Sequence, residues 1–187
     1  MIEEVLPMHN MISDNHEKII RNYIRAKDDN KPYLMGSVFC SSAMLSMMVN
    51  TENIAFPANS FGLDEITNVL VRSFSEKYEN VFTFCLADSV RYQEDLLCCD
   101  WLVAMSEKGS GDLRVGCGRY DWLFSHDSNV LVTQLTITIE HMAVLSPDHA
   151  GQIMSWLDEL PYPFCESKEM LDAMPEMVFL QPVREYL

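Results

Sequence analysis

Val130-Leu-Val-Thr-Gln-Leu-Thr-Ile-Thr-Ile-Glu-His-Met-Ala-Val-Leu145 is the stretch of this sequence in which apolar and polar residues alternate most regularly. In an extended chain one face would be mainly apolar and the other polar: Leu131, Thr133, Leu135, Ile137, Ile139 and His141 against Gln134, Thr136, Thr138 and Glu140. This period of two predicts a β-strand with one buried face. The stretch exceeds the usual length of about 5–6 residues, which favours a strongly bent sheet.

Three further strands are predicted upstream, at residues 81–86, 97–106 and 113–124. The last of these contains Gly116 and Gly118, which suit a bulge or a tight bend in a curved sheet. A shorter hairpin is predicted earlier, with strands at residues 43–49 and 54–56. Together these segments predict a sheet that dominates the second half of the chain.

Three helices are predicted before the long strands. The first begins at Ser13 or Asp14, with Asp14 and Glu17 spaced as a capping box, and carries an apolar stripe made of Ile19, Ile20, Tyr23 and Ile24. A short second helix starts near Pro32 and carries Leu34, Met35, Val38 and Phe39. The third follows Gly62, with apolar residues at a period near 3.6: Ile66, Val69, Leu70, Phe74 and Tyr78.

The C-terminal part is predicted to be helical. Pro147 opens a helix that runs through Leu160, where Pro161 and Pro163 stop it. A short amphipathic piece and a tail follow. We therefore divide the chain into an irregular lead-in at residues 1–12, an α+β domain at 13–146, and a C-terminal helix and tail at 147–187 that pack on the same domain.

Composition excludes some classes of partner. The 187 residues carry 28 acidic and 13 basic side chains, a formal net charge of −15, and the basic residues are not clustered. Nucleic acid and anionic membranes are therefore not expected to bind. The six cysteines form no Cys-x-x-Cys pair, and neither a signal peptide nor a membrane-spanning segment is recognisable, so we expect reduced thiols and a cytoplasmic location.

The order of these elements resembles the nuclear transport factor 2-like superfamily, which includes ketosteroid isomerases, SnoaL-type polyketide cyclases and scytalone dehydratase. Four local segments are similar to it: Tyr23-Ile-Arg-Ala-Lys-Asp28-Asp29, Val38-Phe39-Cys-Ser-Ser-Ala43, Gly62-Leu-Asp-Glu-Ile66 and Gly118-Arg119-Tyr120-Asp121. The resemblance implies an α+β cone, with a strongly curved antiparallel sheet of about six strands on three helices, plus a C-terminal helical extension. It also implies a pocket and a homodimer formed through the sheet.

The ketosteroid isomerase branch places an oxyanion-binding Tyr on the first helix and a carboxylate base after the second. Tyr23 matches the first position, but the segment around Met47 supplies no carboxylate, and a thioether cannot accept a proton from carbon near neutral pH. Whether the chain is an enzyme therefore stays open. The catalytic candidates are Asp121, His141 and Tyr23, and the predicted pocket residues are Tyr23, Phe39, Met47, Trp101, Arg119, Asp121 and His141.

Each polar candidate has a structural alternative. Arg119 and Asp121 share a strand face, either in the pocket or, as we favour, as an ion pair on the convex side. His141 and Tyr23 are more often packed residues with one hydrogen bond, and Asp100 is more often exposed. No His-x-x-x-His or glycine-rich phosphate motif is present, so neither a metal nor a cofactor is expected.

Three functions remain. The first is binding of a small apolar or aromatic metabolite, because a cone lined by Met and aromatic residues offers a suitable pocket. The alternative is a cofactor-free lyase, isomerase or cyclase of the SnoaL or ketosteroid isomerase type. The second alternative is a protein-interaction module that uses the sheet face or the C-terminal extension.

Overall fold

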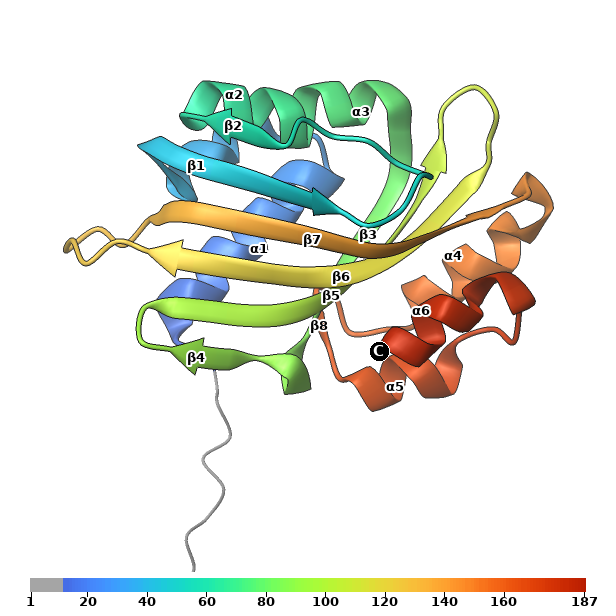
Figure 1. The fold of residues 1–187 in the computed structure, drawn as a ribbon. Coiled ribbons are helices and arrows are strands. Elements are labelled where there is room, and N and C mark those ends of the chain that lie inside the picture. Colours follow the sequence, from blue (N-terminus) through green and yellow to red (C-terminus); the bar gives the residue numbers. More distant parts are fainter. Residues whose placement is uncertain (1–11) are drawn as a thin grey trace, which may run out of the picture.

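The computed structural model describes residues 12–187 (Figure 1). Residues 1–11, most of the predicted lead-in, lie outside the described part of the chain. No helix formed by residues 12–187 is long and apolar enough to cross a membrane.

One curved sheet of eight strands organises the fold, in the order β2-β1-β7-β6-β5-β3-β8, with β4 paired to β5. The strands are β1 (Phe39–Val49), β2 (Asn59–Phe61), β3 (Tyr78–Leu86), β4 (Arg91–Gln93), β5 (Leu96–Glu107), β6 (Leu113–Phe124), β7 (Val132–Leu145) and β8 (Phe164–Cys165). The predicted α+β fold with a curved sheet is confirmed. Its pairing is mixed, because β1 pairs with β7 and β3 with β8 in parallel.

The N-terminal helices cover the concave face of the sheet. Helix α1 (Asp14–Asp28) lies across that face, and a continuous helical stretch made of α2 (Leu63–Thr67), the π-helical η2 (Asn68–Arg72) and α3 (Ser73–Lys77) lies along its edge (Figure 1). The predicted stripe of α1 is buried here, because its 3.6-residue period turns four apolar side chains to the sheet. Ser13 caps α1 by accepting a hydrogen bond from the His16 amide, so the predicted Asp14–Glu17 box does not form the cap.

Two expected elements differ in the structure. The second helix is the 3₁₀ helix η1 (Pro32–Ser37), and Phe39 already belongs to β1. The hairpin partner of β1 is β2, whereas the predicted strand at residues 54–56 is irregular. Ile54 and Phe56 do not belong to a strand. Their apolar side chains line a pocket instead.

A β-bulge divides β7 into two parts. Gly118 of β6 pairs with Ile139, but Cys117 pairs with His141, so Glu140 is an extra residue in β7. Side chains before the bulge alternate as the sequence predicts. Beyond it the alternation reverses, so that Met142 joins the concave core.

The C-terminal layer, residues 147–187, covers part of the convex face (Figure 1). It consists of η4 (Pro147–His149), α4 (Ala150–Asp158), β8, α5 (Ser167–Ala173), η5 (Val178–Leu180) and α6 (Gln181–Tyr186). Its apolar side chains, Ile153, Trp156, Leu157, Met170 and Val183 among them, form one cluster with Phe84, Leu102, Ala104 and Val115 of the sheet. The sheet therefore separates two cores, one on each face.

Candidate functional site

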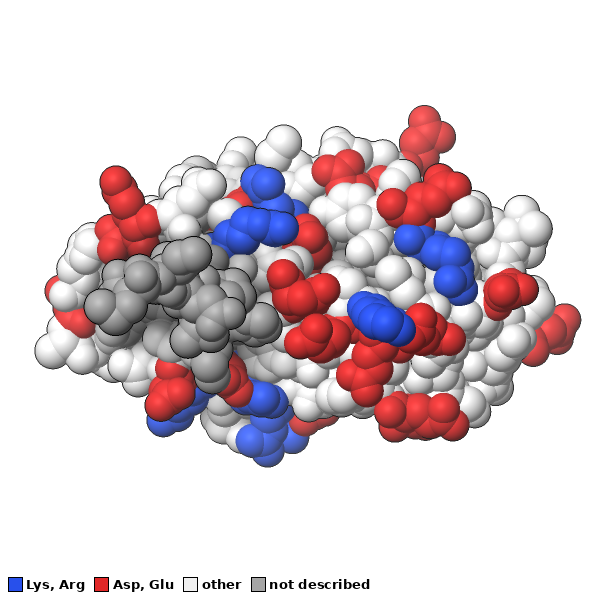
Figure 2. Space-filling model, turned by 90° about the horizontal axis from the view of Figure 1, so that it is seen from below, with Lys and Arg blue, Asp and Glu red and all other residues white. Residues whose placement is uncertain are grey.

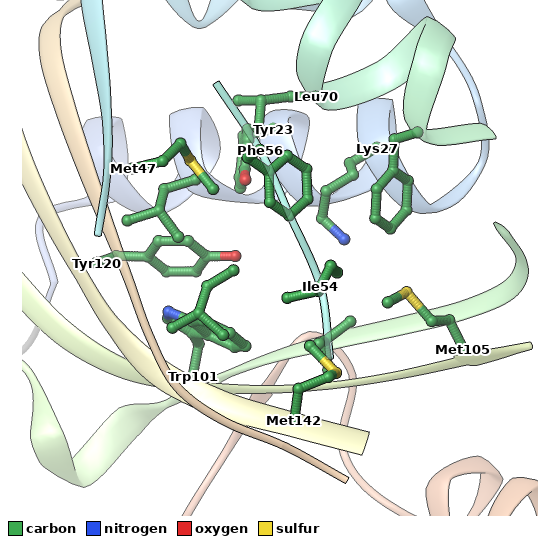
Figure 3. Close-up of a pocket in the computed structure, with 14 residues that line it drawn as sticks. Tyr23, Lys27, Met47, Ile54, Phe56, Leu70, Trp101, Met105, Tyr120 and Met142 are labelled. Carbon is green, nitrogen blue, oxygen red and sulfur yellow. The ribbon is translucent and has the colours of Figure 1, made fainter. Parts of the chain in front are cut away.

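The inner pocket lies between the concave face of the sheet, helix α1, the η2–α3 helix and the 50–58 loop (Figure 3). Fourteen residues line it, and eleven of them are apolar or tryptophan: Met47, Ile54, Phe56, Leu70, Phe74, Trp101, Val103, Met105, Ile137, Ile139 and Met142. The other three carry a hydroxyl or an ammonium group: Tyr23, Lys27 and Tyr120. An apolar lining with a few convergent polar groups is typical of small-molecule sites.

The pocket is small as it stands. Its side chains leave a cavity of about 40 Å³, room for about three water-sized groups. Three of the lining residues are methionines, whose unbranched side chains rearrange easily. A ligand larger than a few atoms therefore requires Met47, Met105 or Met142 to move.

Lys27 is the only charged residue among the fourteen, and its side chain is only 7% exposed. Its Nζ donates to Asp28 Oδ1 at 2.7 Å and to Thr83 Oγ1 at 2.6 Å, and lies 4.9 Å from the centre of the Phe74 ring. Figure 3 shows the ammonium nitrogen pointing into the pocket, between Phe56 and Ile54. A buried ammonium needs such partners, because desolvation without them costs several kcal/mol (~3–5 kcal/mol if a pair is broken).

Asp28 is held by its neighbours. Besides Lys27, its carboxylate accepts hydrogen bonds from the Thr83 amide (2.7 Å), the Thr83 hydroxyl (2.8 Å) and the Tyr162 hydroxyl (2.9 Å). The last bond connects α1 to the C-terminal layer, far away in sequence. Asp28 therefore has its acceptor capacity largely used within the protein.

Aromatic residues form the other wall. Tyr23 packs edge-on against Tyr120 and Trp122, with ring centroids 5.8 and 5.0 Å apart, and the hydroxyls of Tyr23 and Tyr120 face each other (Figure 3). Burial raises the pKa of both hydroxyls above that of an ordinary tyrosine, so both are neutral donors near pH 7. Trp101 stacks on Tyr120, and its buried Nε1 has no hydrogen-bond partner among residues 12–187.

Of the seven predicted pocket residues, three line the inner pocket: Tyr23, Met47 and Trp101. Phe39 is buried behind it, 6.4 Å from the Tyr23 ring. Sequence reasoning missed Lys27, because this residue lies in the polar segment at the C-terminal end of the first predicted helix. It also missed Tyr120, although the alternation of β6 places Tyr120 on the other face of the strand from Arg119 and Asp121.

Arg119 and Asp121 do not reach the inner pocket. They lie on the convex face, where Arg119 Nη2 is 3.0 Å from Asp121 Oδ2 and Arg119 is more than half exposed. Their strand alternation with Val115 and Cys117 was predicted correctly, but that face turns away from α1. The ion pair on the convex side, the favoured alternative, is the arrangement observed.

The prediction that His141 shares a face with Ile139 is wrong. The extra residue Glu140 lies between them, so His141 is exposed on the convex side, with its ring 6.3 Å from that of Tyr186. Asp100 lies on the same side and is half buried, where its Oδ1 accepts a hydrogen bond from the Tyr186 hydroxyl at 3.1 Å. Burial raises the pKa of Asp100, and the bond from Tyr186 opposes that shift.

Within residues 12–187 no three His, Cys, Asp or Glu side chains come together in a way that would hold a metal ion. Charged groups are distributed rather than concentrated. Figure 2 shows acidic side chains over much of the lower face, with the basic ones in small separate groups.

No family model matches the sequence, and no curated protein is significantly similar to it. Solved structures are similar in fold. A nuclear transport factor 2-like superfamily protein from Salmonella enterica serovar Typhimurium superimposes with a TM-score of 0.55 at 14% identity, covering 66% of this chain and 87% of that one. This chain has the nuclear transport factor 2-like fold.

Two further structures of this fold carry descriptions of interest. The hexachlorocyclohexane dehydrochlorinase LinA-type3 from Novosphingobium barchaimii matches with a TM-score of 0.57 at 10% identity, over 69% of this chain and 86% of that one. A protein with a ketosteroid isomerase-like fold from Catenulispora acidiphila, in complex with trimethylamine, matches with a TM-score of 0.52 at 13% identity, over 64% and 83%. The nuclear transport factor 2-like fold thus includes enzymes and ligand-bound proteins.

Proposed function

We propose that this protein binds a small apolar or aromatic metabolite in the inner pocket. The observation that carries the proposal is the composition of the lining: eleven apolar or tryptophan side chains surround the buried ammonium of Lys27. Burying apolar ligand surface against such walls contributes about 25 cal/mol per Å². The cavity volume favours a compact ligand, with methionine movement setting the upper limit of size.

Two adjacent methionines provide a matched test. Met47 lines the pocket, whereas Met48 points to the opposite face and is 55% exposed. Native mass spectrometry of freshly purified protein should reveal an additional small-molecule mass, or toluene should raise the melting temperature of the apo protein. Met47→Trp should abolish either effect, and Met48→Trp should preserve it. Equal responses of both variants would contradict the proposal.

A cofactor-free lyase, isomerase or cyclase is the second candidate. It is supported by the dehydrochlorinase among the similar structures and by the three ionisable groups of the pocket, Tyr23, Lys27 and Tyr120. Against it, none of the fourteen lining residues is a carboxylate or a histidine, and Met47 occupies the position where the base is expected. Deuterium exchange into a bound ketone, measured by mass spectrometry, distinguishes the two: a binder gives no exchange above the rate in buffer.

We also propose that the part of the convex face left open by the C-terminal layer forms a homodimer. Exposed apolar side chains lie on this face, Met48, Phe61 and Leu123, together with the Arg119–Asp121 pair. A two-fold contact would bring each pair opposite its own copy, which is a self-complementary arrangement. The alternative of a protein-interaction module would use this surface or the C-terminal extension.

Light scattering tests the dimer. Leu123→Glu should reduce the mass from dimer to monomer, because two buried carboxylates would face each other across the contact. Val178→Glu, at an 87% exposed position in the C-terminal layer, is the control and should leave the mass unchanged. A monomeric wild-type protein would refute the proposal and leave the face available to another protein.

A cytoplasmic location remains a proposal. All six cysteines are free, and four of them are buried: Cys85, Cys99, Cys117 and Cys165. Reduced thiols of this kind are typical of proteins from reducing compartments.

A further inference from the structure

The Lys27 ammonium has one hydrogen-bond donor left for a ligand. A lysine ammonium carries three N–H groups. Two of them are directed to Asp28 Oδ1 and Thr83 Oγ1. The nitrogen points into the pocket (Figure 3), and Nζ makes no further hydrogen bond to a residue in the 12–187 range. The third N–H is therefore available to an acceptor atom inside the cavity.

The charge of this donor is already balanced. Asp28 lies 2.7 Å from Nζ, and its side chain is only 1% exposed. A carboxylate bound to Lys27 would be attracted by the ammonium and repelled by the carboxylate of Asp28, which lies only slightly farther away. Because Coulomb energy falls only inversely with distance, the repulsion would cancel much of the attraction. It would also lose its hydration inside an apolar pocket. The pair thus offers a strong donor without offering net positive charge.

An uncharged acceptor oxygen fits these conditions. A carbonyl or ether oxygen loses less hydration than a carboxylate, and it gains a hydrogen bond from a charged donor, which is stronger than one between neutral groups. The rest of such a molecule would contact a lining that is mainly apolar, including Ile54, Ile137 and Met142.

We infer that the ligand of the inner pocket is an uncharged, largely apolar molecule with one acceptor oxygen that receives a hydrogen bond from Lys27. This inference rests on the proposed function, since it names the class of ligand that the pocket takes. It assigns Lys27 as the residue that determines specificity for oxygen-bearing ligands over hydrocarbons. Asp28 and Thr83 position the ammonium.

Three probes of similar size test the inference: cyclopentanone, cyclopentane and cyclopentanecarboxylate. Binding is measured by ligand-observed NMR with the wild-type protein and with Lys27→Met, which keeps an unbranched apolar side chain. Cyclopentanone affinity should fall roughly 10-fold or more in the variant, the value of a lost charged hydrogen bond. Cyclopentane affinity should change by no more than about 2-fold.

The control is Lys77→Met. Lys77 lines a separate groove next to Phe74 and is absent from the inner pocket. Both affinities should be unchanged in this variant. Because Lys27→Met leaves Asp28 buried with one partner fewer, the double variant Lys27→Met/Asp28→Asn is measured as well, and it should show the same loss of ketone preference.

A readout in the wild-type protein avoids substitution altogether. The carbonyl stretch of bound cyclopentanone should move to lower wavenumber than in hexane, as it does on accepting a hydrogen bond. An unshifted stretch, equal losses for ketone and hydrocarbon, or tighter binding of the carboxylate would each overturn the inference. If none of the three probes binds the wild-type protein, the proposed function itself fails, which is a distinguishable result.

Discussion

At the scale of single residues, Gly118 allows β6 and β7 to approach at the bulge. A Cβ at this position would lie 1.9 Å from the Thr138 carbonyl oxygen and 2.9 Å from Trp101 Cζ2. The first of these atoms belongs to the backbone, so it cannot rotate away. The absence of a side chain at Gly118 therefore determines how closely the strands approach beside the pocket.

Gly118→Ala should destabilise the protein by about 3 kcal/mol or more, the upper range for overpacking a core. The midpoint of urea unfolding measures the change. Gly151→Ala is the control, since a Cβ there meets nothing within 4 Å and lies in the first turn of α4. It should stabilise by about 0.4–1 kcal/mol. Equal midpoints for the two variants would disprove the close approach.

Asp100 makes stability depend on pH in a defined direction. Burial raises its pKa in the folded protein, so the folded state binds this proton more tightly than the unfolded chain does. The contribution of the group is therefore most favourable below the unfolded pKa, near 4, and declines as pH rises through the folded pKa.

Asp100→Asn should consequently gain stability relative to the wild-type protein as pH rises from about 4 to 7. The amide oxygen can still accept the hydrogen bond from Tyr186. Urea unfolding at several pH values measures the difference, with Asp172→Asn at an exposed position as the control for charge. A difference that shrinks with rising pH would refute the assignment.

At the scale of elements, the 50–58 loop and the η2–α3 helix enclose the inner pocket together. Phe56 of the loop and Phe74 of the helix line both the inner pocket and a second groove of about 210 Å³, which also contacts Lys77 and Tyr78. The two aromatic rings thus separate a small inner cavity from a larger outer one. The π-helical turn η2 brings Leu70 to the pocket within this helix.

Phe56→Ala should join the two cavities and speed the exchange of a bound probe such as toluene, measured by NMR line broadening. The expected loss of stability is about 1–2 kcal/mol, below the ~3–5 kcal/mol for a fully buried Phe, because Phe56 is only partly buried. Phe179→Ala, at a 59% exposed position, should change neither quantity. An unchanged exchange rate in Phe56→Ala would exclude this route.

At the scale of the whole molecule, the sheet has a hydrophobic core on each of its two faces. The C-terminal layer covers buried side chains of the convex face, including Phe84, Leu102 and Val115, and Tyr162 bonds to Asp28 beyond the edge of the sheet. We therefore expect the layer to fold together with the sheet and to support the Lys27 site.

Removing residues 161–187 should abolish cooperative thermal unfolding or make the protein insoluble, since apolar surface over β3, β5 and β6 would be exposed. Calorimetry of the truncated chain measures this. Val178→Ser is the control, because this 87% exposed side chain contributes little to the core. A truncated chain with the wild-type melting temperature would make the layer a separable docking extension.

Local pattern predicted most of the long elements. The alternation in residues 130–145 and 113–124 and the stripe of α1 identify strands and a helix, because backbone geometry repeats every 2 or about 3.6 residues. The length of the strand at 130–145 and the two glycines in the strand at 113–124 predict a curved sheet. The resemblance in the order of the elements predicts the nuclear transport factor 2-like fold, and the alternation in residues 113–124 predicts that Arg119 and Asp121 share a face.

Only the tertiary structure decided which face encloses the pocket and what stands in it. Glu140 shifts the register and reverses the side of every later residue in β7, an effect that no local period encodes. Lys27 becomes a pocket residue because Thr83 and Phe74, distant in sequence, surround its ammonium. The period of apolar residues along the sequence indicates which side chains are buried. The partners of a buried charge, in contrast, depend on contacts between segments that are distant in sequence.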